Sequence, residues 1–217
     1  MSLGDFKAAI FDLDGTLIDS NDVWARIDVE FLARRGFQVP PDYLQDVRSL
    51  KFSEAADYTI KRFGLSDAPE ALMGEWYHMA IGQYSRKVPL KPWAGEYLRF
   101  LKGRGVRLAT ATGLPRELYE AVLKNNGVFG LFEAHTSADE TPRGKEFPDV
   151  YLLAAQKMGL PPGDCAVFED VLACVKSALL AGMKVCAVYD PAAEKEWAEM
   201  SALATMSVRD FRELMAE

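Results

Sequence analysis

The pattern of hydrophobic and polar residues alternates, over most of the chain, between short apolar runs and glycine-flanked segments with helical spacing. The expected strands cover residues 6–11, 106–110, 133–137, 165–170 and 184–189. The helices expected between them cover residues 97–103, 115–125, 149–158 and 172–181. Strands that alternate with helices predict an α/β fold, in which helices cover both faces of a parallel sheet.

The stretch between the first strand and residue 88 differs, because its pattern is helical throughout. Val23, Ile27 and Phe31 recur at the spacing of one helix face. Three further helices are expected. A short one follows Pro41, the next begins near Ser53, and the last covers residues 69–87. The following segment, residues 88–93, contains two prolines and reads as a linker.

A purely helical block after the first strand predicts a second, smaller unit inserted into the α/β domain. We expect a core domain formed by residues 1–19 and 89–217 and a helical domain formed by residues 20–88. The two ends of the insert, near Ser20 and Val88, should then lie close together.

Composition excludes some classes of protein. The net charge of −7 argues against non-specific binding to nucleic acids or anionic membranes. No signal peptide is expected, and no run approaches the length of a membrane span. The three cysteines, without a Cys-x-x-Cys pair, are typical of buried reduced thiols and indicate a cytoplasmic protein.

Polar residues of types that serve in catalysis and in ligand binding lie where the expected strands end. In open parallel sheets, ligands bind beyond the carboxyl ends of the strands. The residues at these ends, together with a basic residue of the loop at residues 141–149, are Asp12, Asp14, Thr110, Glu169, Asp170, and either Arg143 or Lys145. Carboxylates without histidine or cysteine suit Mg²⁺, and a cation, a hydroxyl and a lysine together suit a phosphoryl group.

Each of these residues has a plainer explanation when taken alone. An Asp-x-Asp pair before Gly15 is usually a turn, and Thr110 could satisfy backbone groups at a strand end. Lys145 could be solvated, and the Glu169-Asp170 pair could cap the next helix. Their shared position at one edge of the sheet favours a functional site.

The residues at these strand ends resemble the four motifs of the haloacid dehalogenase superfamily. The four stretches are "FDLDGTLID", "LATATG", "GKEFPDVYLLAA" and "VFEDVLACVKSALLAGM". The third selects Lys145 over Arg143, and the resemblance covers nearly the whole chain. The insert resembles the four-helix cap of the β-phosphoglucomutase-like and phosphoglycolate phosphatase-like branch. The resemblance implies a Rossmann-like core domain with an inserted helical cap.

The resemblance also implies roles for the two aspartates. Asp12 would be the nucleophile that forms an aspartyl-phosphate, and Asp14 would be the general acid and base. Asp14 favours phosphate esters as substrates, because dehalogenases of this superfamily have no acid at that position.

The remaining motif residues would bind the phosphoryl group and the metal ion. Phosphate-binding groups would be Thr110, the backbone amide of Ala111, and Lys145. Mg²⁺ would be held by Asp12, the backbone carbonyl of Asp14, and Asp170. Glu169 would support these ligands without contacting the metal ion, or would bind it through a water molecule.

The chain departs from the family pattern at several positions. Trp24 stands where β-phosphoglucomutase has a cap histidine, which weakens a mutase interpretation. Val171, Cys174, Glu146 and Phe147 also replace the usual residues of the third and fourth motifs.

The leading hypothesis is a monomeric, Mg²⁺-dependent phosphatase that acts on a small phosphorylated metabolite such as a sugar phosphate. One alternative is a phosphosugar mutase. An alternative of another class is a phospho-aspartate signalling or partner-binding module with little turnover. Specificity should lie in the cap, where the candidate pocket residues are Trp24, Arg26, Lys51, Trp76 and Tyr84.

Overall fold

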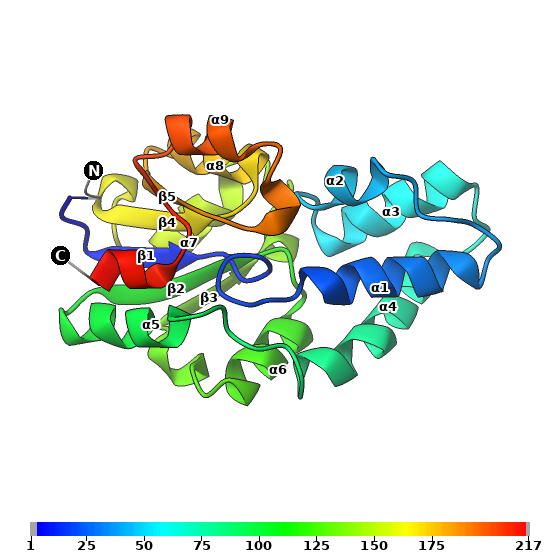
Figure 1. The fold of residues 1–217 in the computed structure, drawn as a ribbon, viewed down its shortest axis with the longest axis horizontal. Coiled ribbons are helices and arrows are strands. Elements are labelled where there is room, and N and C mark those ends of the chain that lie inside the picture. Colours follow the sequence, from blue (N-terminus) through cyan, green and yellow to red (C-terminus); the bar gives the residue numbers. More distant parts are fainter. Residues whose placement is uncertain (1–3, 216–217) are drawn as a thin grey trace.

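A computed structural model describes residues 4–215 (Figure 1). Within these residues the chain forms a six-stranded parallel sheet with the strand order β3-β2-β1-β4-β5-β6. The strands are β1 (Ala8–Phe11), β2 (Arg107–Thr112), β3 (Ala134–Ser137), β4 (Cys165–Glu169), β5 (Lys184–Val188) and β6 (Met206–Val208). This order, with β1 in the middle, is that of a Rossmann-like sheet, and the predicted α/β fold class is confirmed.

Helices cover both faces of the sheet (Figure 1). They are α5 (Ala94–Gly103), α6 (Arg116–Asn125), α7 (Asp149–Lys157), α8 (Leu172–Leu180) and α9 (Trp197–Leu203). Successive residues of a strand point to opposite faces. Phe11 therefore stacks on Phe168 at 4.4 Å in the apolar cluster shared with α5 and α6. Ile10 and Val167 belong to the cluster shared with α7, α8 and α9.

Most predicted elements are present with shifted ends. β1 begins at Ala8 rather than at residue 6, and β2 extends to Thr112. β6 and α9 were not predicted from the sequence. The described residues also contain short 3₁₀ helices at Phe129–Leu131, Ala138–Glu140, Pro162–Asp164, Pro191–Ala193 and Phe211–Met215. The three cysteines are free and buried, as predicted.

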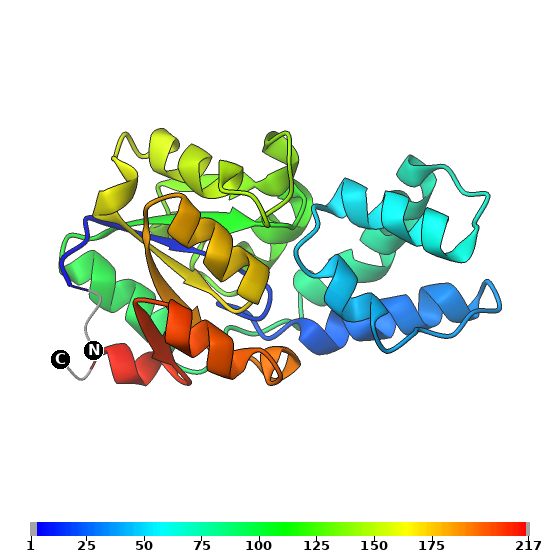
Figure 2. The same cartoon turned by 90° about the horizontal axis from the view of Figure 1, so that it is seen from above.

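The helical stretch after β1 forms four helices that lie beyond the carboxyl end of the sheet (Figures 1 and 2). They are α1 (Asn21–Ala33), α2 (Tyr43–Val47), α3 (Phe52–Phe63) and α4 (Pro69–Tyr84). Helix α3 begins at Phe52, one residue before Ser53, and its N-cap is Lys51. Trp76 of α4 contacts Phe31 of α1 and Phe52 of α3, with ring centroids 5.5 and 5.7 Å apart. These aromatic contacts hold three of the four helices together.

The two segments that connect the helices with the sheet run side by side. The N–H of Asp19 donates to the carbonyl of Pro89 at 3.0 Å, and Ile18 and Leu90 form an antiparallel bridge. The side chain of Asn126, at the end of α6, donates to the carbonyl of Val88 at 3.0 Å and accepts from the N–H of Leu90 at 3.2 Å. The ends of the helical insert are thus adjacent.

The division into a core of residues 1–19 and 89–217 and an insert of residues 20–88 stays a prediction, and residues 1–3 and 216–217 of it lie outside the described part. No helix within residues 4–215 is both long and apolar enough to cross a membrane.

Candidate active site

The chain turns sharply at the end of β1, and this turn positions the first two acids. The N–H of Asp12 still donates to the carbonyl of Phe168, at 3.1 Å, so Asp12 continues the strand. The carbonyl of Leu13 then accepts from the N–H groups of residues 16–18 at 2.9 to 3.1 Å. Gly15 has a φ of 77°, a conformation that glycine adopts without strain. Asp12 therefore stays at the strand end, and Asp14 lies within the turn.

Three carboxylates meet beyond the ends of β1 and β4. Phe11 pairs with Phe168 in the sheet, so the next residues along the two strands, Asp12 and Glu169, are neighbours. Single oxygens of Asp12, Glu169 and Asp170 all lie within 4.8 Å of one another, and all three side chains are buried. These residues were predicted to lie at one sheet edge, and in the structure they form one cluster.

Lys145 compensates part of this negative charge. Its Nζ lies 2.5 Å from an oxygen of Asp12 and 2.5 Å from an oxygen of Glu169, and only 4% of the residue is exposed. Burial by itself lowers the pKa of Lys145, but the charges of Asp12 and Glu169 outweigh burial and raise this pKa well above its usual value. Lys145 therefore keeps its proton and its positive charge at neutral pH.

The same surroundings raise the pKa of Asp12. Burial is the main cause, Lys145 opposes it, and the charges of Glu169 and Asp170 add to it. Glu169 is held in place by the hydroxyl of Tyr151, at 2.7 Å, and by the N–H of Asp170, at 3.1 Å. One lysine among three acids leaves an excess of negative charge.

A residue of the helical insert binds the third acid. Arg48, just after α2, donates to Oδ2 of Asp170 at 2.7 Å, and the Thr16 hydroxyl donates to Oδ1 at 2.8 Å. Burial raises the pKa of Asp170 to about 6, while the nearby charge of Arg48 opposes that shift. The Arg48–Asp170 ion pair joins the helical insert to the sheet.

The acidic cluster could hold a metal ion. Its ligand atoms are carboxylate oxygens, which hard cations such as Mg²⁺ prefer. A divalent cation would also offset the mutual repulsion of the acids, which adds to the effect of burial in raising the pKa of Asp12. The chemistry of the donor set therefore fits a divalent ion.

Asp14 lies outside the acidic cluster. Its Oδ1 accepts hydrogen bonds from the hydroxyls of Ser20 and of Tyr84, the latter at 2.5 Å. Burial raises the pKa of Asp14, and hydrogen bonds from Ser20, Tyr84 and Trp24 oppose the rise. The two aspartates of the first motif are thus held by different partners, Asp12 by Lys145 and Asp14 by hydroxyls at the ends of the insert.

Thr110 and Ala111 lie at the end of β2, next to β1. The pairing of Phe11 with Thr110 puts Ala111 beside Asp12. The Thr110 hydroxyl, however, lies 3.2 Å from Nδ1 of His135 on β3. The role of both residues in phosphate binding stays a prediction.

A cavity of about 490 Å³ connects the acids with the helical insert. Its lining includes Asp12, Asp14 and Lys145, which surround the ends of the strands, and Trp24 and Trp76 of the helical insert. Two of the candidate pocket residues therefore reach it. Tyr84 contacts Asp14 instead.

Arg26 and Lys51, the other two candidates, are placed elsewhere. Arg26 lines a groove on the outer side of the insert, and Lys51 donates to the carbonyl of Pro142 at 3.3 Å.

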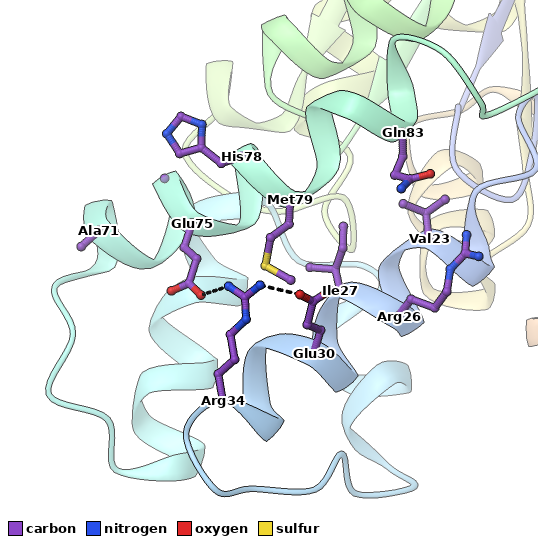
Figure 3. Close-up of a pocket in the computed structure, with 11 residues that line it drawn as sticks. Val23, Arg26, Ile27, Glu30, Arg34, Ala71, Glu75, His78, Met79 and Gln83 are labelled. Carbon is purple, nitrogen blue, oxygen red and sulfur yellow. Dashed lines mark hydrogen bonds and ion pairs between the residues drawn. The ribbon is translucent and has the colours of Figure 1, made fainter.

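That outer groove, between α1 and α4, is a larger cavity of about 860 Å³ (Figure 3). Figure 3 shows Arg34 between Glu30 and Glu75, and its Nη1 lies 3.2 Å from Oε1 of Glu75. None of the predicted catalytic, phosphate-binding or metal-binding residues lines it. The smaller cavity is therefore the candidate active site.

Four site residues were missed from the sequence. Ser20 contacts Asp14, Thr16 and Arg48 contact Asp170, and Tyr151 contacts Glu169. Tyr151 carried a weak signal, because it lies within the third motif on the apolar face of a helix. Arg48 carried none, since its contact spans 122 residues of sequence.

Comparison with known proteins identifies relatives of this chain. The family model of the haloacid dehalogenase-like hydrolases matches residues 6–182. Protein CbbY of Rhodobacter capsulatus is 32% identical over 192 residues, which cover 83% of this chain and 84% of that protein. Hexitol phosphatase B of Escherichia coli is 29% identical over 212 residues, with 97% and 95% covered. The crystal structure of CbbY from Rhodobacter sphaeroides in complex with phosphate has the same fold, with a TM-score of 0.86, 20% identity and 96% of each chain covered.

Proposed function

Because the chain belongs to the haloacid dehalogenase-like hydrolases, we propose that it is a Mg²⁺-dependent phosphatase of a small phosphate monoester, such as a sugar phosphate. The observation that carries the proposal is the separation of Asp12 from Asp14. One lies in the acidic cluster with Lys145, and the other is bound by Ser20 and Tyr84 outside it. The relative named hexitol phosphatase B supports a phosphorylated polyol or sugar as the substrate class.

Asp12 is the proposed nucleophile. Its carboxylate attacks phosphorus, the bond to the leaving oxygen breaks, and an aspartyl-phosphate forms. Water then attacks phosphorus, so that phosphate leaves and the Asp12 carboxylate is restored. Lys145, which touches Asp12, stabilises the negative charge of the phosphoryl oxygens during both transfers.

Asp14 is the proposed proton carrier. It donates a proton to the leaving alcohol in the first transfer and accepts one from water in the second. Its raised pKa helps it to hold a proton before the reaction. Ser20 and Tyr84 keep its carboxyl group oriented towards the leaving group.

The proposed metal ligands are Asp12, Asp170 and the backbone carbonyl of Asp14. Glu169 is proposed to support these ligands without contacting the metal ion, or to bind it through a water molecule. When bound, Mg²⁺ supplies positive charge for the phosphoryl oxygens. The Ala111 amide and the Thr110 hydroxyl are proposed to bind those oxygens with Lys145. The Thr110 hydroxyl must then give up its contact with His135 in order to bind a phosphoryl oxygen.

The helical insert, residues 20–88, is proposed to act as a cap that covers the cavity and excludes bulk water. The lining of the cavity by Trp24, Phe52 and Trp76 supports this role. The monomeric state and the cytoplasmic location stay predictions from the sequence.

A hydrolysis screen tests the proposed function. Phosphate release from sugar, polyol and aromatic phosphomonoesters would be measured with Mg²⁺ and with EDTA, for the natural chain and for Asp12→Asn. We expect turnover that needs Mg²⁺ and that falls on the order of 10³-fold or more in the variant. No hydrolysis of any ester, or equal turnover by Asp12→Asn, would contradict the proposal. Isomerisation of a hexose phosphate that depends on a bisphosphate would instead indicate a mutase.

A further inference from the structure

Asp28 is a buried acid that the proposed reaction does not use. It lies on α1, only 5% of it is exposed, and it lines the same cavity as Asp12 and Asp14. No lysine, arginine or histidine side chain in the described part of the chain pairs with it. A carboxyl group buried without a basic partner costs free energy of folding, which is unusual unless a ligand uses the group.

The polar neighbour of Asp28 is a tyrosine that is shared with a second residue. The Tyr43 hydroxyl is hydrogen-bonded to the carboxyl group of Asp28 and lies 2.8 Å from Oγ1 of Thr59. Tyr43 has one hydroxyl hydrogen, whereas an ionised carboxylate accepts several hydrogen bonds. Asp28 therefore keeps the capacity to accept a hydrogen bond from a further donor.

Aromatic side chains surround the route from Asp14 to Asp28. Trp24, Phe52 and Trp76 line the cavity, and their rings contact one another with centroids 5.7 and 5.8 Å apart. Trp24 reaches Asp14 and precedes Asp28 by four residues on α1. Residues four apart share one helix face and are separated by a rise of about 6 Å. A leaving group of several carbons, with its phosphate at Asp12, would therefore extend past Trp24 to Asp28.

We propose that Asp28 binds a hydroxyl group of the leaving group, so that the enzyme selects phosphate esters of polyhydroxylated carbon chains over esters of apolar alcohols. This inference rests on the proposed phosphatase function. A hydroxyl group fits Asp28 because it can both donate and accept a hydrogen bond.

The surroundings of Asp28 also favour a hydroxyl group over a charged one. Burial raises the pKa of Asp28 to about 7, so both protonation states of its carboxyl group occur near neutral pH, and a hydroxyl can pair with either.

Substrates matched in carbon number test the inference. The value of kcat/KM would be measured for D-sorbitol 6-phosphate, n-hexyl phosphate and 6-aminohexyl phosphate, with the natural chain, Asp28→Leu and Asp28→Asn. Asp57→Asn, at an exposed position of α3, is the control for a lost acid in the insert. The natural chain should prefer sorbitol 6-phosphate over hexyl phosphate.

Asp28→Leu should lower kcat/KM for sorbitol 6-phosphate about 10- to 100-fold and leave hexyl phosphate almost unchanged. Asp28→Asn, whose amide donates and accepts, should lose less, and again mainly with sorbitol 6-phosphate. Asp57→Asn should leave all three values unchanged. If Asp28→Leu does not fold, the selective loss in Asp28→Asn carries the test.

Three outcomes would overturn the inference. They are a natural chain without preference for sorbitol 6-phosphate, an equal loss on both neutral esters, and a preference for 6-aminohexyl phosphate that Asp28→Asn abolishes. Hydrolysis of p-nitrophenyl phosphate separates this inference from the proposed function. If that ester is hydrolysed and only the selectivity is missing, the role of Asp28 fails; if no ester is hydrolysed, the phosphatase function fails.

Discussion

The sheet and the helical insert both bury carboxyl groups, but they stabilise them differently. At the sheet edge, Asp12 and Glu169 share Lys145, and Asp170 accepts hydrogen bonds from Thr16 and Arg48. In the insert, Asp28 has a tyrosine hydroxyl nearby and no basic partner among the described residues. In the proposed function, the first arrangement serves the phosphoryl group that every substrate shares. The second leaves a carboxyl group able to form a further hydrogen bond, which only some substrates would provide.

Asp14 stands between these two regions. It belongs to the turn after β1, yet its partners Ser20 and Tyr84 come from the two ends of the insert. Substitutions at the sheet edge should therefore lower the turnover of all substrates alike, whereas substitutions of Asp28 should lower it for some substrates only. Substitution of Asp14 should lower turnover most for substrates whose leaving group needs a proton.

Among variants that keep the proposed nucleophile, the largest expected effect is that of Asp14→Asn. This variant cannot donate a proton, so kcat for a sugar or polyol phosphate should fall about 10²- to 10⁴-fold. With p-nitrophenyl phosphate the loss should be much smaller, because that leaving group departs without a proton. Steady-state kinetics with both esters measures the difference. Equal losses would show that Asp14 does not act on the leaving oxygen.

Lys145→Met should test whether the acids of the sheet edge depend on their shared cation. Removal of Lys145 leaves Asp12 and Glu169 buried without it, so the free energy of unfolding should fall by about 3 kcal/mol in EDTA. Saturating Mg²⁺ should restore most of this loss, because the metal ion replaces the missing charge. Urea unfolding with and without Mg²⁺ measures both values. A loss that Mg²⁺ does not reduce would speak against a metal ion in the acidic cluster.

Asp28→Asn should change how stability depends on pH. The pKa of Asp28 is about 7 in the folded chain against 3.8 for an ordinary aspartate, so between these values the folded state holds a proton that the unfolded state has released. This group's contribution to the free energy of unfolding therefore falls as pH rises from about 4 to 7, and asparagine removes that fall.

Between pH 5 and pH 8, the free energy of unfolding of Asp28→Asn should thus gain about 2 kcal/mol relative to the natural chain. Urea unfolding at both pH values measures the gain, and Asp57→Asn should show none. Parallel pH profiles for Asp28→Asn and the natural chain would mean that Asp28 is not desolvated as described.

Much of the fold could be predicted because each central strand is an apolar run followed by a polar residue. β1, β4 and β5 are buried almost throughout, which makes their sequences distinct from the helices between them. β6 gave no such signal, since it has three residues, one of them buried, and pairs with β5 alone. Because β6 lies at the edge of the sheet, it can form without a continuous run of apolar residues.

The site could be predicted as far as the sheet determines it. Parallel strands bring their carboxyl ends to one edge, and this rule alone gathers Asp12, Glu169 and Asp170. Contacts from the insert follow no such rule. Arg48 meets Asp170, and Tyr84 meets Asp14, only because of how the helices pack against the sheet, which helical periodicity does not specify.

The central place of β1 in the sheet also has a consequence for biosynthesis. β1 is made before both of its partners, β2 and β4, which follow roughly 100 and 160 residues later. At the usual pace of translation the ribosome needs about 10 to 30 s to reach β4. During that interval an apolar strand waits without its neighbours and needs protection from aggregation, which makes the nascent chain a candidate client for chaperones. The strand that leads to the proposed nucleophile is thus also the described strand that waits longest for its neighbours.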